Sequence, residues 1–182
     1  MTLWSEDSIS SFLEQGGWLS EVAGEDFNGY VSAVAKAMSL PRHGVIVSGE
    51  YGCGKTSAMN VLLSHPYWTA PSVFDLNNPD DVAKLNYADH PVAMDYIFNT
   101  SNAVLLDDLG AESVVNEYGV KRDYVSEFIS RIHLNKNIRL FITTNLRGDE
   151  LAERYSGRIV SRLKDLCVPY KFVGTDKREW EI

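Results

Sequence analysis

The chain has 182 residues, of which 45% are hydrophobic and 23% are charged, and its formal net charge is −8. These values are typical of a soluble globular domain and exclude a collagen-like, low-complexity or disordered chain. The negative charge argues against a protein that coats nucleic acid by bulk electrostatics, and two cysteines are too few for a disulfide framework or a zinc site.

Helices and strands are predicted to alternate along the chain. In chain order they are a helix at 26–40, a strand at 43–48, a helix at 55–64, a strand at 72–75, a helix at 92–99, a strand at 103–107, a helix at 121–136, a strand at 138–143, helices at 149–155 and 158–166, and a strand at 170–173. This alternation predicts an α/β fold in which helices cover both faces of a central parallel sheet. We expect one domain over residues 41–182, after an N-terminal helical extension over residues 1–40.

Residues 49–56 match the phosphate-binding loop pattern G-x-x-x-x-G-K-[ST] and lie between a predicted strand and a predicted helix. Glycines let the backbone N–H groups turn towards phosphate oxygens, and the start of the following helix favours the same anion. We expect Lys55 to contact the β- and γ-phosphates of ATP and Thr56 to ligate Mg²⁺. The other predicted nucleotide-binding residues are Gly49, Glu50, Tyr51, Gly52, Cys53, Gly54 and Ser57. Cys53 occupies a variable position of the pattern and is given no catalytic role.

The apolar strand at 103–106 is followed by two acids, Asp107 and Asp108. Carboxylates that end a buried parallel strand lie at the carboxyl edge of the sheet, where open α/β sheets bind their ligands. Because a phosphate-binding loop precedes them, we expect Asp107 to hold Mg²⁺ as the Walker B acid and Asp108 to orient and deprotonate the attacking water. Without that loop, the same residues would also fit an ordinary turn.

The segment 140–146 is a second buried strand that ends in polar residues, Thr143, Thr144 and Asn145. If this strand lies beside the Walker B strand, Asn145 or Thr144 is placed near the γ-phosphate and the attacking water. Asn145 would then act as a sensor of the nucleotide state. The same residues also fit the N-cap of a helix.

Three arginines are candidates for completing the site. Arg158 and Arg162 are four residues apart in a predicted helix and therefore share one face of it. Such a pair is typical of a solvated surface, but in a phosphate-loop ATPase it also fits an arginine finger supplied in trans by another subunit. Arg178, near the C-terminus, is a further candidate for contact with the nucleotide.

Charge is distributed unevenly along the chain. Residues 1–120 carry 4 Lys and Arg against 16 Asp and Glu, a net −12, whereas residues 121–182 carry 13 against 9, a net +4. A basic surface helix would account for this difference. Alternatively, the molecule has unlike faces that favour head-to-tail self-association, which builds rings or open helices.

Four strings together resemble the AAA+ ATPase domain of bacterial replicative-helicase loaders of the DnaC and DnaI type, close to the ATPase subunits that assist some transposases. In order and spacing, the strings are Gly49–Thr56, Leu105–Glu112, Thr143–Leu146 and Tyr155–Leu163. The resemblance implies a P-loop NTPase fold of the AAA+ and ASCE type, without a C-terminal helical lid. It implies Asp107 and Asp108 in Walker B and Asn145 as sensor 1. It also implies Arg158 and Arg162 in the arginine-finger segment and Arg178 in a sensor-2-like position.

The resemblance implies ATP and Mg²⁺ as cofactors, a spiral assembly, contact with single-stranded DNA and a hexameric helicase as client. Residues 75–99 contain five aspartates and one lysine, so we expect contact with DNA to be weak. About 40 residues precede the first strand, so we expect the helicase-binding N-terminal domain of the family to be missing. The apolar runs are far shorter than the roughly 20 residues that span a bilayer, and no signal peptide is recognised, so we expect a cytoplasmic protein without a membrane partner.

We therefore expect a Mg²⁺-ATP-dependent ATPase of the helicase-loader type that acts in DNA replication and hydrolyses ATP with an arginine finger in trans. One alternative is a transposition-helper ATPase, which has the same site and a transposase as client. Another is an adaptor that binds ATP to switch its assembly and barely hydrolyses it, which the retained Asp108 disfavours. A small-molecule kinase would require a lid that binds the acceptor, and the sequence offers none.

Overall fold

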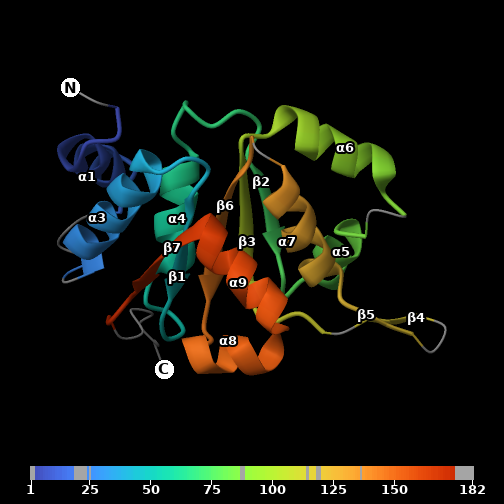
Figure 1. Ribbon diagram of the computed structural model, residues 1–182. Helices are drawn as coiled ribbons and strands as arrows, with labels where there is room; N and C mark the ends of the chain where they lie inside the picture. Colours follow the sequence, from blue (N-terminus) through green and yellow to red (C-terminus); the bar gives the residue numbers. More distant parts are fainter. Residues whose placement is uncertain are drawn as a thin grey trace, which may run out of the picture.

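The computed structural model describes residues 3–18, 24, 26–86, 89–113, 115–117, 120–135 and 137–174. A five-stranded sheet forms the centre of the molecule (Figure 1). In spatial order its strands are β2 (Ser72–Asp75), β3 (Ala103–Leu109), β6 (Arg139–Thr144), β1 (Gly44–Ser48) and β7 (Cys167–Lys171). All neighbouring strands pair in parallel, as the alternating sequence pattern predicts.

Helices cover both faces of this sheet (Figure 1). One face is covered by α1 (Glu6–Gln15), α3 (Asp26–Ser39) and α4 (Lys55–Leu63). The other face is covered by α5 (Pro79–Lys84), α6 (Pro91–Thr100), α7 (Tyr124–Leu134), α8 (Gly148–Arg154) and α9 (Gly157–Leu166). None of the helices among the described residues is both long and apolar enough to cross a membrane.

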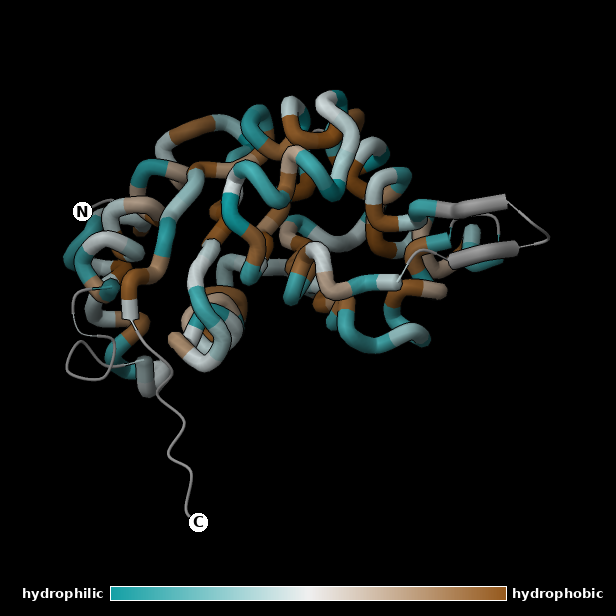
Figure 2. The backbone as a smooth tube through the Cα atoms, turned by 90° about the horizontal axis from the view of Figure 1, so that it is seen from below, coloured by the Kyte–Doolittle hydropathy of each residue, from teal (hydrophilic) through white to brown (hydrophobic). Residues whose placement is uncertain are grey.

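Alternation along the strands divides the core into two layers. Leu105 and Phe141 point into the layer under α1, α3 and α4, whereas Leu106 and Leu140 point into the layer on the other side of the sheet. Successive side chains of a strand point to opposite faces, so strands buried on both faces are apolar throughout. In Figure 2 the hydrophobic segments of the chain accordingly lie mostly in the interior and the hydrophilic ones mostly at the periphery. Side chains of the N-terminal helices α1 and α3 belong to the first of these two layers, together with side chains from one face of the sheet.

Some element boundaries differ from those predicted. The predicted helix at 121–136 begins only at Tyr124, because residues 120–122 form strand β5 (Val120–Arg122), which pairs with β4 (Val115–Glu117) in a hairpin that projects from the body (Figure 1). Asp123 then caps α7 by accepting a hydrogen bond from the Ser126 amide (3.0 Å). The last strand begins at Cys167, earlier than predicted. It contains Pro169, which is tolerated because β7 is an edge strand.

Candidate nucleotide site

Because the five strands are parallel, their carboxyl ends lie at one edge of the sheet, and that edge gathers the polar residues singled out in the sequence. The loop 49–54 follows β1, the two acids lie near the end of β3, and Asn145 follows β6. Strand β6 lies between β1 and β3, as the interpretation of Asn145 requires. Lys55, Asn145 and Asp108 are therefore close in space although they are distant in sequence.

Lys55 is almost completely buried, with 5% of its surface exposed. Its ammonium group donates hydrogen bonds to the carbonyl oxygens of Gly49 (3.0 Å) and Glu50 (2.7 Å) and to Oδ1 of Asn145 (2.8 Å). An ammonium group has three N–H donors, and these three acceptors occupy all of them. A phosphate that binds Lys55 must therefore replace some of these acceptors.

Asp107 is held by two hydroxyl groups. Thr56 Oγ1 donates to its Oδ1 (3.0 Å), and Thr143 Oγ1 donates to the same oxygen (2.5 Å). Burial raises the pKa of Asp107. The hydrogen bonds from Thr143 and Thr56 oppose that rise, and the neighbouring carboxylates of Asp108 and Asp75 add to it.

The pair Thr56 and Asp107 fits a Mg²⁺ ion. Two oxygen ligands on adjacent corners of a Mg²⁺ octahedron lie about 2.9 Å apart, given metal–oxygen distances of about 2.0–2.1 Å. The measured separation of Thr56 Oγ1 and Asp107 Oδ1 is 3.0 Å. Mg²⁺ keeps several waters and needs only one or two protein ligands when phosphates supply the others. The described residues contain no cluster of three or more His, Cys, Asp or Glu side chains that could hold a metal ion.

Asp108 has a left-handed backbone conformation, with φ of 61°. Strand β3 continues through both acids to Leu109, past the predicted end at 107, and the pairing with β6 is irregular between Leu106 and Leu109. The Asp108 amide donates to Thr143 Oγ1 (2.8 Å), which fixes this irregular stretch. A left-handed aspartate costs of order 1 kcal/mol, and such conformations cluster at functional sites.

Both carboxylate oxygens of Asp108 accept a hydrogen bond from a side-chain amide. Asn145 Nδ2 donates to Oδ1 (3.2 Å), and Asn77 Nδ2 donates to Oδ2 (2.7 Å). Asn145 thus bridges the ammonium group of Lys55 and the carboxylate of Asp108. Thr144, the alternative to Asn145, is buried and donates to the carbonyl of Leu109 (2.6 Å), so its hydroxyl does not face the site.

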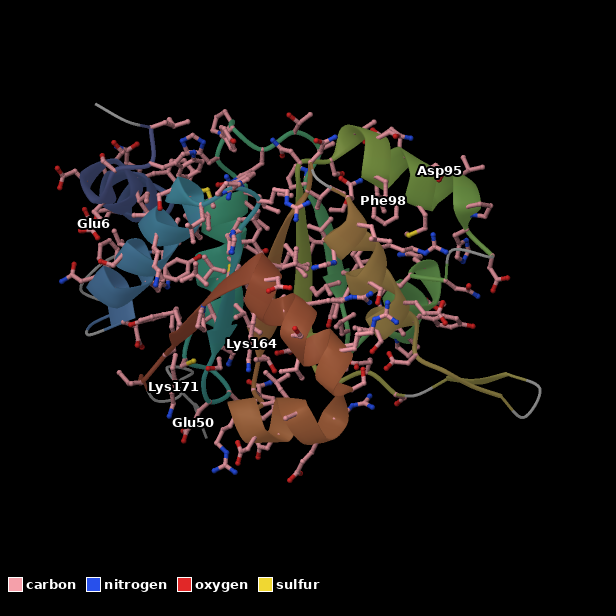
Figure 3. All side chains as sticks on the ribbon, viewed as in Figure 1. Glu6, Glu50, Asp95, Phe98, Lys164 and Lys171 are labelled. Carbon is pink, nitrogen blue, oxygen red and sulfur yellow. The ribbon has the colours of Figure 1, made fainter. Side chains whose placement is uncertain are left out.

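Two adjoining cavities lie at this edge. The smaller, about 260 Å³, is lined by Tyr51, Gly52, Gly54, Lys55, Thr56, Ser57, Asp108 and Asn145. The larger, about 720 Å³, extends past Asn145 to Ser48, Gly49 and Glu50, the start of α8, and residues 171–174. Lys171, the last residue of β7, and Glu50, two residues after β1, both line it and are labelled in Figure 3. Cys53 is fully buried and lines neither cavity.

The candidate arginines lie apart from this cluster. Arg162 donates a hydrogen bond to the Ser130 hydroxyl of α7, and Arg158 is exposed. Neither lines either cavity. Arg178 lies outside the described residues.

A buried carboxylate that sequence reasoning did not single out joins the loop after β3 to α8. Glu112 accepts hydrogen bonds from the Gly110 amide (2.9 Å), the Tyr155 hydroxyl (2.5 Å) and Arg154 Nη2 (3.3 Å). Burial and the neighbouring Glu112 carboxylate raise the pKa of Tyr155, so this hydroxyl stays a donor. The turn between α8 and α9 is therefore fixed to the loop that follows Asp108.

Sequence reasoning also missed Asn77 and Thr143 as members of the site. Asn77 belongs to a polar turn after β2, and Thr143 was assigned only to a strand. Two acids at the end of one strand are a signal that hydroxyl and amide partners on neighbouring strands are needed. That signal does not identify which residues supply them.

Comparison with known proteins identifies solved structures that have a similar fold. No protein-family model matches the sequence, and no curated protein sequence matches it. Among solved structures, the DnaC helicase loader matches with a TM-score of 0.60 at 21% identity, covering 82% of this chain and 91% of that one. A DnaI structure matches with a TM-score of 0.61 at 22% identity, covering 87% and 93%. AMPPCP-bound DnaA from Aquifex aeolicus matches with a TM-score of 0.58 at 17% identity, covering 82% of this chain and 47% of DnaA.

The chain shares the α/β fold of these helicase-loader and DnaA structures. The predicted fold class is thereby confirmed, and so is the resemblance to helicase loaders at the level of fold. Within this fold, the cluster around Lys55, Asp107 and Asn145 occupies the carboxyl edge at which open α/β sheets bind their ligands.

Proposed function

We propose that the chain is a Mg²⁺-ATP-dependent ATPase of the helicase-loader type that acts in DNA replication. The observation that carries this proposal is the continuous set of hydrogen bonds from Lys55 through Asn145 to Asp108, beside the pair Thr56 and Asp107. Lys55, Asp108 and Asn145 line the 260 Å³ cavity, and the second carboxylate, that of Asp107, is bonded to Thr56, which also lines it. Phosphoryl transfer requires this set, because its catalysis is mainly positioning and charge stabilisation.

The chemistry assigns a task to each residue. Lys55 exchanges its carbonyl acceptors for β- and γ-phosphate oxygens, and the loop amides bind the same phosphates. Thr56 and Asp107 would hold Mg²⁺, which offsets phosphate charge when bound. Asp108 accepts a proton from water as the water oxygen bonds to the γ-phosphorus, and the bond to the ADP oxygen breaks with its electron pair on ADP. Asn145, which touches both Lys55 and Asp108, orients that water and senses the γ-phosphate.

Replacement of Lys55 tests nucleotide binding. We expect Lys55→Ala to weaken Mg²⁺-ATP binding by about 100-fold or more, because each hydrogen bond between an ammonium and a phosphate contributes about 1.5–3 kcal/mol. Titration calorimetry measures the two affinities. Lys36→Ala removes an exposed lysine on α3 and serves as the control. Equal affinities of the parent and Lys55→Ala would contradict the assignment.

We further propose that the site is completed in trans by head-to-tail self-association. Among the residues that the structure describes, Lys55 is the one lysine or arginine that lines the 260 Å³ cavity, whereas Arg147 and Lys171 line the larger one. Arg158 and Arg162 lie on α9 in the basic part of the chain, and the acidic part bears the carboxylates of the site. An arginine finger in trans contributes about 10³–10⁵ in rate. Arg162 is the first candidate, and Arg158 and Arg178 are weaker ones.

Mixing two inactive variants tests this assembly. Lys55→Ala subunits lack the phosphate-binding lysine but carry Arg162, whereas Arg162→Ala subunits bind ATP but lack the finger. We expect parental ATPase activity per subunit to rise with protein concentration, Arg162→Ala to remain low at all concentrations, and the mixture to recover part of the activity. Activity that is independent of concentration, together with no recovery on mixing, would exclude a finger in trans.

The proposed client is drawn by analogy from proteins with the same fold. One of these is a DnaC helicase loader, and another is the replication initiator DnaA, solved with AMPPCP and single-stranded DNA. By analogy, we propose a replicative helicase as client, with a transposase as the alternative, and weak contact with single-stranded DNA. The non-hydrolysing adaptor is disfavoured by Asp108, whose carboxylate faces the phosphate cavity. Steady ATP turnover that is lost in Asp108→Asn would support the ATPase, whereas tight ATP binding without turnover would favour the adaptor.

A further inference from the structure

Asp26, at the start of α3, has a buried carboxylate whose two oxygens both bind backbone amides of the segment after β7. Its Oδ1 accepts from the amide of Val173 (2.8 Å), and its Oδ2 accepts from the amide of Gly174 (2.9 Å). Only 1% of the Asp26 surface is exposed. The Tyr170 hydroxyl adds a hydrogen bond to the Asp26 carbonyl oxygen (3.3 Å). Hydrogen bonds to a charged acceptor are stronger than neutral ones, so this contact fixes residues 173 and 174 firmly.

The segment that Asp26 holds is a wall of the larger cavity. Residues 171–174 line the 720 Å³ cavity together with the start of the phosphate-binding loop. The two cavities share Asn145, so the larger one is the space next to any phosphates bound beside Lys55. Val173, whose side chain is 61% exposed, offers an apolar surface there.

The N-terminal segment also supports this wall from behind. The Trp18 ring stacks on Phe172, with ring centroids 5.8 Å apart and an angle of 16° between the planes. It also stacks on Phe27, at 5.4 Å. Trp18 lies close to the phosphate-binding loop as well, since a Cβ added to Gly54 would be 3.7 Å from its Nε1. Segments before β1 therefore contact both the phosphate loop and the cavity wall.

We propose that Asp26 is a positioning residue for nucleoside recognition. This inference rests on the proposed ATP binding. The Phe172 amide donates to the Ser48 carbonyl (2.7 Å), which fixes residue 172 to the end of β1. By holding the next two amides, Asp26 sets where residues 173 and 174 lie beside the larger cavity, and so determines how well a nucleoside fits beside bound phosphates. The N-terminal extension then has a role inside the nucleotide site. An asparagine at this position would keep one acceptor and turn an NH₂ group towards a backbone N–H, so it cannot hold both amides.

The test compares two ligands that share phosphates and differ in the nucleoside. ATP and inorganic tripolyphosphate are titrated calorimetrically, with Mg²⁺, into the full chain and into Asp26→Asn. We expect Asp26→Asn to weaken ATP binding by about tenfold, the usual scale of one lost charge-assisted contact. We expect tripolyphosphate affinity to change by less than about twofold, because the loop 49–54 and Lys55 bind it. A merely structural role of Asp26 would not change the ratio of the two affinities.

A second carboxylate at a helix start provides the matched control. Asp123 caps α7 through the Ser126 amide, and it lines neither cavity. Asp123→Ala is expected to lower stability without changing the ratio of ATP to tripolyphosphate affinity. If thermal melting shows that Asp26→Asn does not fold, Asp26→Glu keeps both acceptors but displaces them, and the ratio should shift in the same direction by a smaller factor.

The outcomes separate this inference from the proposed function. If the parent binds both ligands and Asp26→Asn weakens both equally or neither, Asp26 does not position the nucleoside wall and the inference is overturned. If the parent binds neither ligand, the proposed nucleotide binding itself is overturned, and this inference is overturned with it.

Discussion

The two edges of the sheet use hydrogen bonds in different ways. At the amino edge, side chains bond to backbone carbonyl oxygens: one guanidinium nitrogen of Arg139 donates to the carbonyls of Ala37 (3.0 Å), Leu40 (3.1 Å) and His43 (2.5 Å). Trp68 likewise donates to the carbonyl of Leu62 (2.8 Å). At the carboxyl edge Lys55 also donates to two carbonyls, but the bonds through Asn145, to Lys55 and to Asp108, join side chains to side chains.

Because of this difference, we expect the amino edge to contribute mainly to stability and the carboxyl edge mainly to function. One partly buried guanidinium nitrogen of Arg139 binds three carbonyl oxygens of the segment before β1, so the amino edge is a structural seam. Bonds between side chains can be exchanged by rotamer changes, so the carboxyl edge can accept a phosphate without unfolding. We therefore expect substitutions at the amino edge to lower stability, and substitutions at the carboxyl edge to change activity more than stability.

The largest effect is expected for Asp108→Asn. The amide keeps the shape of the side chain and its contact with Asn77, but it cannot accept a proton from water. We expect ATP turnover to fall about 100-fold or more, while ATP affinity and the unfolding midpoint stay near parental values. Single-turnover hydrolysis, calorimetry and urea unfolding measure the three quantities, with the exposed Asp149→Asn on α8 as control. Unchanged turnover would make Asp108 an ordinary turn residue.

A loss of stability of about 2–3 kcal/mol is expected for Arg139→Ala at the opposite edge, because three partly buried carbonyls lose a charged donor. Burial lowers the pKa of Arg139, and the neighbouring Tyr67 hydroxyl opposes that change. Urea unfolding measures the loss, and Arg139→Lys, which keeps the charge without the guanidinium geometry, should lose less. An Arg139→Ala variant that is as stable as the parent, or one that folds but no longer binds ATP, would contradict the expectation that the amino edge serves stability and the carboxyl edge serves activity.

The smallest effect, and one of opposite sign, is expected for Asp107→Asn. The raised pKa means that the folded protein binds this proton more tightly than the unfolded chain does, so the ionised carboxylate lowers stability at neutral pH. Its removal should raise stability by about 0.5–2 kcal/mol above the folded-state pKa, while Mg²⁺-dependent turnover falls. The gain should vanish as the pH falls below the ordinary aspartate pKa, where Asp107 is protonated in both states. Thermal melting at several pH values measures this, and a loss of stability at neutral pH would contradict the prediction.

Local sequence patterns were sufficient for the parts of the fold and site that depend on short-range order. The phosphate loop, the paired acids and the apolar strands are each contiguous, so their periodicity and spacing identify them. The position of Asn145 in the site could be predicted because the carboxyl ends of parallel strands lie at the same edge of a sheet. The roles of Asp107, Asp108 and the arginines stay predictions.

Long-range pairings could not be predicted in the same way. Asn77 is one of two consecutive asparagines in a turn, and nothing local indicates that its amide reaches Asp108. The contact of Asp26 with residues 173 and 174 joins segments almost 150 residues apart. The end of β5 lies within the predicted helix at 121–136, because the apolar spacing of that segment holds only from Tyr124 onwards.

The amide of Asn145 lines both cavities at the carboxyl edge, and its orientation is set by an ammonium group on one side and a carboxylate on the other. The two protons of that amide therefore experience different electric fields. In a chain labelled with ¹⁵N asparagine, this side chain would give a magnetic resonance signal whose frequency depends on where the lysine points. A single pair of peaks would then report the arrival of a ligand at either cavity, without any modification of the protein.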